Sequence, residues 1–296
     1  MIKLGSVVAL TSGVSPTLRL WQVAESCKNY RDAAGLTIEE AAERLRSRSA
    51  RWSRSKIQRL ETRLYAPQPT EIEQLTAGYG VPADEAAALV QMAREARQKG
   101  WWQTSAIPKH FQTFVGLEAA ATEIRQFDLA LIPGLLQTSD YARALMAAIE
   151  PATPPDVLEH LVAGRMSRQQ VLTRADPPHL SVIMSEAVLH CQVGSRRVWR
   201  GQLERLLEAI DSQNIVIQIL PFTAGPHPGL EGSFEVLSLP DLACDVGFAE
   251  GTIGSLYMES PEDVRRCVMR FATLSTVALL PDASAALVSS VLKEYQ

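Results

Sequence analysis

A dense block of basic side chains occupies residues 44–63 of this 296-residue chain, with Glu61 as the single acid among them. Arginine and lysine bind phosphate oxygens and also donate hydrogen bonds to O6 and N7 of guanine, whereas glutamine pairs with N6 and N7 of adenine. A block of these residue types predicts a surface that binds duplex DNA. The basic residues are Arg44, Arg46, Arg48, Arg51, Arg54, Lys56, Arg59 and Arg63.

The net charge of the whole chain, −4, hides an uneven distribution along the sequence. Residues 1–100 carry 15 basic and 11 acidic residues, and residues 101–296 carry 14 and 22. Salt screens charges that lie more than about 8 to 10 Å apart, so a distant acidic region does not cancel a local basic block. The pattern favours DNA binding by the first hundred residues. A solvated helix face would give the same pattern on charge alone.

Short helices are predicted around the basic block. Thr37 is a suitable N-cap, and Glu40 three residues later completes the pattern of a capping box. Ser53 can cap the next helix, Arg54 to Arg63. Flanking helices are predicted from the apolar periodicity over residues 18–34, 70–79 and 84–98. Five short helices in succession indicate a compact all-α domain over residues 17–100, after a flexible lead-in of residues 1–16.

Two consecutive short helices suit a helix-turn-helix, in which the second helix enters the major groove with its N-terminus leading. Ile57 and Leu60 occupy the core-facing positions of the helix Arg54 to Arg63, which leaves the polar side chains at its start facing outward. We therefore predict that this helix reads bases and that its neighbours hold phosphates. The predicted DNA-binding residues are Thr37, Arg46, Arg48, Arg51, Ser53, Arg54, Ser55, Lys56, Gln58, Arg59 and Arg63.

This region resembles the xenobiotic-response-element (XRE) family of helix-turn-helix transcriptional regulators. The matching residues are Ala34-Gly35-Leu36-Thr37, Leu45, Ser53-Arg54-Ser55-Lys56 and Arg59-Leu60-Glu61. The resemblance implies a structural role for Glu61, which ties the third helix to neighbouring elements in that family. Two features depart from the pattern: Ile38 replaces a common phosphate-binding glutamine, and the spacing from Leu45 to Lys56 is several residues longer. The longer spacing implies either an extended turn or an overrun of the second helix.

Residues 101–296 are predicted to form an α+β domain with an antiparallel sheet. The strands are expected over residues 179–184, 215–222, 233–239, 246–251 and 255–259. The helices are expected over residues 111–127, 138–149, 155–174, 197–210, 261–280 and 282–294. Short turns between neighbouring strands favour antiparallel pairing. Trp101 and Trp102 stand where the two domains join, and we predict that they pack at that junction.

Motifs along the second domain resemble actinobacterial regulators that carry the same helix-turn-helix ahead of an uncharacterised, antitoxin-like C-terminal domain. The motifs are Phe114-Val-Gly-Leu-Glu118, Ile132-Pro-Gly-Leu-Leu-Gln-Thr138, Tyr141-Ala-Arg143, Arg165-Met-Ser-Arg-Gln169, Glu186-Ala-Val-Leu189, Leu220-Pro-Phe-Thr-Ala-Gly225 and Gly232-Ser-Phe234. The resemblance implies that a small partner protein is encoded beside the regulator.

No catalytic or metal-binding pattern is found in the second domain. HExxH, GxSxG and Gly-rich phosphate loops are missing, and the four cysteines form no CxxC pair. Glu186, His190 and Cys191 come closest to a metal set, but a structural role is favoured. We therefore expect no enzyme activity, no metal and no cofactor. No stretch approaches the roughly 20 apolar residues of a membrane span, and we expect a cytoplasmic protein.

Two functions fit these observations. The Arg-rich helix favours a transcriptional regulator that binds double-stranded DNA, with a homodimer as the expected state because such regulators usually read two half-sites. The size of the second domain leaves room for an antitoxin-like protein-interaction module that binds a small partner protein. The two functions can coexist in one chain.

Overall fold

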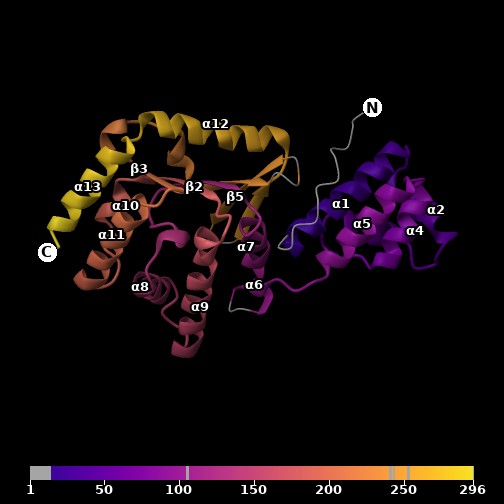
Figure 1. Ribbon diagram of the computed structural model, residues 1–296, viewed down its shortest axis with the longest axis horizontal. Coiled ribbons are helices and arrows are strands. Elements are labelled where there is room, and N and C mark those ends of the chain that lie inside the picture. Colours follow the sequence, from indigo (N-terminus) through magenta and orange to yellow (C-terminus); the bar gives the residue numbers. More distant parts are fainter. Residues whose placement is uncertain (1–14, 105–106, 240–241, 243, 252–253, 296) are drawn as a thin grey trace. The chain divides into compact units, whose positions relative to one another are not determined.

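The computed structural model describes residues 15–104, 107–239, 242, 244–251 and 254–295. The predicted lead-in, residues 1–16, lies almost entirely outside the described residues. The chain divides into two compact units, residues 1–100 and residues 101–296, and each is described by itself (Figure 1).

The first unit consists of five helices that agree with the sequence prediction to within a few residues. They are α1 (Pro16–Ala33), α2 (Ile38–Arg46), α3 (Arg54–Glu61), α4 (Pro69–Tyr79) and α5 (Ala83–Ala96). Pro16 and Pro69 lie in the first turn of their helices, where the missing N–H costs nothing, and Gly80 ends α4 with a left-handed backbone (φ 74°). One apolar core holds the bundle together, formed by residues that include Cys27, Leu45, Trp52, Ile57, Leu60, Ile72, Leu75 and Leu89.

The second unit is built on one six-stranded sheet, so the predicted α+β class is confirmed. The strands are β1 (Glu123–Asp128), β2 (His179–Ser185), β3 (Ile215–Leu220), β4 (Phe234–Leu239), β5 (Cys244–Gly251) and β6 (Gly254–Met258). Their order across the sheet is β3-β2-β1-β4-β5-β6. The five strands expected from the sequence are present, and β1 is an additional one at the centre of the sheet.

The sheet is mixed: three of its five strand pairs are antiparallel as predicted, β1–β4 among them, and two are parallel. β4, β5 and β6 follow one another through short connections and pair antiparallel, whereas β1 pairs parallel with β2 and β2 pairs parallel with β3. Parallel neighbours need a crossover, which helices supply between these strands. β1 was missed because it overlaps residues 111–127, which were expected to be helical, whereas β2 and β3 were both predicted and pair parallel because a helical crossover connects them.

Helices cover both faces of the sheet (Figure 1). The helices of the second unit are α6 (Trp101–Thr104), α7 (Gln112–Glu118), α8 (Ser139–Ile149), α9 (Pro155–Arg168), α10 (Ala187–His190), α11 (Arg196–Ile210), α12 (Pro261–Val277) and α13 (Pro281–Lys293). Single 3-10 turns are η1 (Lys109–Phe111), η2 (Gly134–Leu136), η3 (Gln169–Thr173), η4 (Phe222–Ala224) and η5 (Pro228–Glu231). Phe271 and Leu274 of α12 pack on Phe127 and Phe234 of one face, and α7 and α9 lie on the other.

No single helix in the described part of the chain is long and apolar enough to cross a membrane. α12 and α13 reach the required length and composition only when they are taken together across their 70° bend.

Candidate nucleic-acid interface

The two helices of the predicted helix-turn-helix begin at the capping residues that the sequence indicates. Thr37 Oγ1 accepts a hydrogen bond from the Glu40 N–H at 3.2 Å, and the Thr37 N–H donates to Glu40 Oε2 at 2.8 Å. Ser53 Oγ accepts from the Lys56 N–H at 3.2 Å. These caps satisfy N–H groups that have no partner inside their helices. Thr37 and Ser53 therefore define where α2 and α3 start, which is a structural role beside any contact with phosphate.

The turn between these helices is extended, because α2 ends at Arg46 and α3 begins at Arg54. Trp52 anchors this turn in the core: its ring is fully buried, and its indole N–H donates to Gln74 Oε1 at 2.9 Å. The role of Trp52 did not emerge from the sequence, although a lone large aromatic residue within a polar, basic stretch is a usable signal. The lengthened turn is thus a packed element of the domain.

The outer face of α3 presents Arg54, Ser55, Gln58 and Arg59, all of which are exposed. Ile57 and Leu60 are fully buried on the opposite face, as predicted. Arg54 Nε lies 2.6 Å from Glu39 Oε1 of α2, but both side chains remain largely exposed. An exposed ion pair of this kind contributes about 1 kcal/mol or less, so Arg54 is readily released to a stronger anionic partner.

Lys56 lies on the inward side of α3, in contrast to the four exposed residues. Its ammonium group pairs with Glu71 of α4 and lies 4.7 Å from the centre of the Trp52 ring. Burial alone would raise the pKa of Glu71, but hydrogen bonds from Lys56, the Tyr65 hydroxyl and the Gln68 N–H hold that pKa below its usual range. Lys56 therefore connects α3 to α4, and its donors are directed into the domain.

Arg63 also lies away from the start of α3. It follows the helix with a left-handed backbone (φ 64°), and the Leu64 N–H donates to the Arg59 carbonyl at 2.8 Å, as in a helix-ending Schellman motif. The Arg63 guanidinium lies 4.0 Å from the centre of the Trp21 ring and 3.9 Å from Glu25 of α1. Arg63 thus packs on α1 at the C-terminal end of α3.

The arginines of the turn fall into two groups. Arg46 Nε donates to the Trp52 carbonyl at 3.4 Å, and Arg48 Nη2 donates to the Ala77 carbonyl at 3.0 Å in the last turn of α4. A cation at a helix C-terminus stabilises that helix. Arg51 is exposed, and its guanidinium has no ion pair within the described part of the chain. Arg51 is therefore the turn arginine most available to a phosphate.

The fold and this geometry define the class of the first unit. Residues 24–89 match the family described as "Helix-turn-helix domain", so the first unit is a helix-turn-helix DNA-binding domain. Over residues 111–290 the chain matches the family described as "Domain of unknown function (DUF5753)", and the chain belongs to this family. No protein of curated function and no solved structure is significantly similar to the chain.

The second unit contains the other residues that the sequence singled out. Trp101 and Trp102 form α6, with their rings edge to face at 5.9 Å; Trp102 is buried and Trp101 is exposed. Their role at the domain junction stays a prediction. Glu186 Oε2 accepts a hydrogen bond from the Phe222 N–H at 2.7 Å. The part of the chain that the structure describes holds no cluster of three metal-binding side chains.

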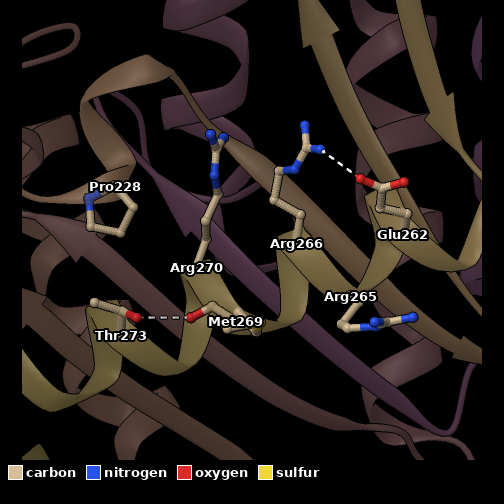
Figure 2. Close-up of a pocket in the computed structure, with 7 residues that line it drawn as sticks. All are labelled: Pro228, Glu262, Arg265, Arg266, Met269, Arg270 and Thr273. Atoms are coloured by element: carbon tan, nitrogen blue, oxygen red, sulfur yellow. Dashed lines mark hydrogen bonds and ion pairs between the residues drawn. The ribbon is translucent and has the colours of Figure 1, made fainter.

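A shallow groove runs along the outer side of α12 (Figure 2). Arg266 and Arg270 point to one side of the helix and Arg265 to the other, as the close-up shows. Arg270 pairs with Glu231 at 2.5 Å and Arg266 with Glu262 at 3.4 Å. The groove is exposed and its arginines are partly paired, so its attraction for anions is weak.

Proposed function

We propose that the protein is a sequence-specific transcriptional regulator of the XRE type that binds double-stranded DNA with α3 in the major groove. One observation carries the proposal: the exposed face of α3 combines Arg54, Ser55, Gln58 and Arg59 on a capped helix of a helix-turn-helix domain. These side chains can donate to guanine, pair with adenine and bind phosphate from one helix face.

The start of α3 is the part that we assign to base reading. Helix N-termini carry partial positive charge and enter the groove first in this class of domain. Arg54 and Gln58 lie one helical turn apart on the exposed face and so reach successive base steps. We assign Arg51 in the turn to the phosphate backbone of the DNA, because contacts there supply affinity without sequence information.

We further propose that the regulator acts as a homodimer. Proteins of this class usually bind two half-sites about one helical turn of DNA apart, and the two-fold symmetry of the protein then matches a palindromic operator. Chromosomal DNA as the target implies a cytoplasmic location.

The second unit is proposed to receive an effector or a small partner protein and to control DNA binding, without enzymatic activity of its own. Its excess of acids, 22 against 14 basic residues over residues 101–296, makes it a poor DNA-binding surface. Trp101 and Trp102 begin this unit, and we propose that they transmit the effect. An effector changes DNA affinity only by its differential affinity for two states of the protein, typically about 1 to 3 kcal/mol.

DNA affinity measured with the DNA that flanks the protein's own gene tests the main proposal. Arg54→Ala and Gln58→Ala should each reduce specific binding by about 1 to 3 kcal/mol and affect non-specific binding less, because each removes a base contact. Arg265→Ala in the second unit is the matched control, since it removes an arginine that is also exposed, from α12. Unchanged operator binding by both α3 variants would rule out α3 as the reader.

The control of DNA binding is tested with the product of the neighbouring small reading frame. DNA affinity should change with this partner for the full chain but not for a variant that carries Trp101→Ala and Trp102→Ala. An equal response of a fragment ending at Lys99 would instead place the effector site in the helix-turn-helix domain.

A further inference from the structure

The face of the sheet that lies toward α7 and α9 carries polar side chains at its centre. Gln126 and Asp128 alternate along β1 with Phe127, which belongs to the apolar core under α12. Glu235 of β4 stands directly opposite Gln126 in the strand register. Residues opposite each other in a sheet point to the same face, and so do residues two apart on one strand. Gln126, Asp128 and Glu235 therefore form one polar group on the sheet.

Three oxygen atoms of this group are enclosed without a hydrogen-bond donor. They are Gln126 Oε1, Asp128 Oδ2 and Glu235 Oε2, none of which accepts a hydrogen bond from any residue that the structure describes. Gln126 as a whole is only 5% exposed. Nearly all buried acceptors in folded proteins are satisfied, and an unsatisfied one is costly to keep. Three in one place need a common explanation.

Two arginines of α9 approach the same layer, but only one of them is neutralised. Arg168 makes a buried, two-pronged ion pair with Glu118, at 2.5 and 2.6 Å, and stacks on Phe114 at 5.0 Å. Arg165 Nη1 donates to Gln137 Oε1 at 3.1 Å, and Arg165 forms no ion pair with a described acid. Burial and the charge of Arg168 lower the pKa of Arg165 to about 10. Within the described part of the chain, Arg165 thus keeps N–H groups without an acceptor in the same layer as the three oxygen atoms without a donor.

The surrounding chain holds Arg165 in this position. A Cβ atom on Gly134 would lie 2.8 Å from Arg165 Nη1, so a larger residue there would displace the guanidinium from its present position. Gln169 Nε2 donates to the carbonyls of Gly134 and Gln137, at 3.0 and 2.7 Å. Two sequence motifs that play no part in the proposed DNA binding therefore pack on each other. They are Ile132 to Thr138 and Arg165 to Gln169. Together they position the free arginine, which is the kind of support that a binding site requires.

Three residues of the polar layer are partly exposed to solvent. Asp128, Glu235 and Arg165 are half-buried as whole residues, although the oxygen atoms named above are enclosed. A small molecule can therefore contact the exposed parts of these side chains, and rotation of the side chains would bring the enclosed oxygens to it.

We propose that this layer is a binding site for a small polar amine. The ammonium N–H groups would donate to Gln126 Oε1, Asp128 Oδ2 and Glu235 Oε2, and an acceptor group on the same molecule would receive the free donors of Arg165. An ammonium ion carries several donors and no acceptor, which matches three oxygens that lack donors. Charge-assisted hydrogen bonds to carboxylates are the strong ones in such a site.

Binding of an amine here must depend on pH. Burial raises the pKa of Asp128 to about 7 and that of Glu235 to about 8. An ammonium ion favours the charged carboxylates, so binding should release protons and become tighter as the pH rises through this range. The charged and titratable groups that face the two acids are Glu118 on α7, Arg165 and Arg168 on α9, Tyr141 on α8 and Glu250 on β5.

Isothermal titration of the full-length protein tests the proposal with ethanolamine and L-lysine, which carry an acceptor beside the amine. At least one should bind, several-fold more tightly at about pH 8 than at about pH 6, with proton release detected in buffers of different ionisation enthalpy. Tetramethylammonium, a cation without N–H donors, should not bind. Failure of both amines, or equal binding of tetramethylammonium, would overturn the proposal.

Two near-isosteric variants locate the site. Asp128→Asn and Glu235→Gln should each weaken amine binding about tenfold or more, while the melting temperature stays equal or rises because a buried acid is removed. Glu123→Gln on the same strand is the control, since Glu123 pairs with Arg125 at 2.8 Å and should leave binding unchanged. Parent-like binding or a lower melting temperature in both test variants would contradict the assignment. These measurements need no DNA, so their outcome is separate from that of the proposed regulator function.

Discussion

Arg31 of α1 and Glu61 of α3 form a two-pronged ion pair inside the helix-turn-helix domain, with Nε–Oε1 at 2.7 Å and Nη2–Oε2 at 2.8 Å. Both side chains are more than nine-tenths buried, at 9% and 8% exposure. Arg31 Nη1 also donates to the Leu36 carbonyl at 2.8 Å, in the segment that leads into α2. The pair therefore fixes the orientation of α3 relative to α1 and α2. The structural role that the family resemblance implies for Glu61 is confirmed.

Loss of this pair should destabilise the domain strongly. Glu61→Gln removes the buried counter-charge of Arg31 and leaves only the half-exposed Asp32, 2.6 Å from Nη1, so we expect the free energy of unfolding to fall by about 3 kcal/mol in urea titrations. Glu25→Gln, which removes a half-exposed acid 3.9 Å from Arg63, should cost less than about 1 kcal/mol. Equal losses of unfolding free energy in the two variants would show that the buried pair contributes no more to stability than the exposed one.

Glu39 on α2 should act against DNA binding. It is exposed, pairs with Arg54 at 2.6 Å and places a negative charge beside the proposed reading face. We expect Glu39→Gln to tighten binding to all DNA by about 0.5 to 1 kcal/mol in fluorescence anisotropy at low salt, because it frees Arg54 and removes repulsion from phosphates. Glu43→Gln, also exposed on α2 but in its middle, serves as the comparison. Weaker binding of Glu39→Gln would mean that the pair with Arg54 positions the arginine.

The turn arginines should separate in a salt titration. Arg51→Ala should lower the slope of log affinity against log salt by about one unit, because one phosphate contact is lost. Arg48→Ala should leave much of that slope but lower the unfolding free energy by about 0.5 to 1 kcal/mol, since its bond to the Ala77 carbonyl at the end of α4 is removed. The reverse assignment of the two effects would contradict the contacts seen in the turn.

Lys56 should matter for stability and not for base discrimination. Its ammonium group pairs with Glu71 while its stem crosses the Trp52 ring, so Lys56→Met keeps the packing but leaves Glu71 without its cation. We expect a loss of about 1 to 3 kcal/mol in unfolding free energy and an unchanged ratio of specific to non-specific affinity. A changed ratio, measured by competition with mutated operator, would return Lys56 to the set of base-reading residues.

Glu235 should make the stability of the second unit depend on pH. Burial raises its pKa to about 8, so the folded protein keeps a proton that the unfolded chain releases near the ordinary pKa of 4.5. The stability from this neutral carboxyl is fully present below the unfolded pKa and is lost as the pH rises toward the folded one. Glu235→Gln should therefore gain about 1 to 2 kcal/mol over the parent at about pH 8 and little at about pH 4, a range that allows for its partial exposure. A gain that does not depend on pH would exclude titration of Glu235 as the cause.

Local sequence signals were sufficient for the helix-turn-helix domain. The apolar spacing of Ile57 and Leu60 sets which face of α3 is outward, and the caps at Thr37 and Ser53 set where the helices begin. Both effects act within one or two helical turns, so they can be read from neighbouring residues. The same holds for strands β2 to β6, whose apolar or alternating runs end at turn residues.

Contacts between residues far apart in the sequence decided the rest. β1 carries Gln126 at a buried position and Asp128 at a half-buried one, which resembles no strand pattern until the sheet and the arginines of α9 are placed against it. Lys56 has the composition of a DNA contact, yet Glu71, fifteen residues away, directs it inward. A side chain's partner in the folded chain, and not its type, determines whether its charge faces solvent or the core. Only the tertiary structure therefore separated the exposed residues of α3 from the inward ones and brought the polar layer of the second unit together.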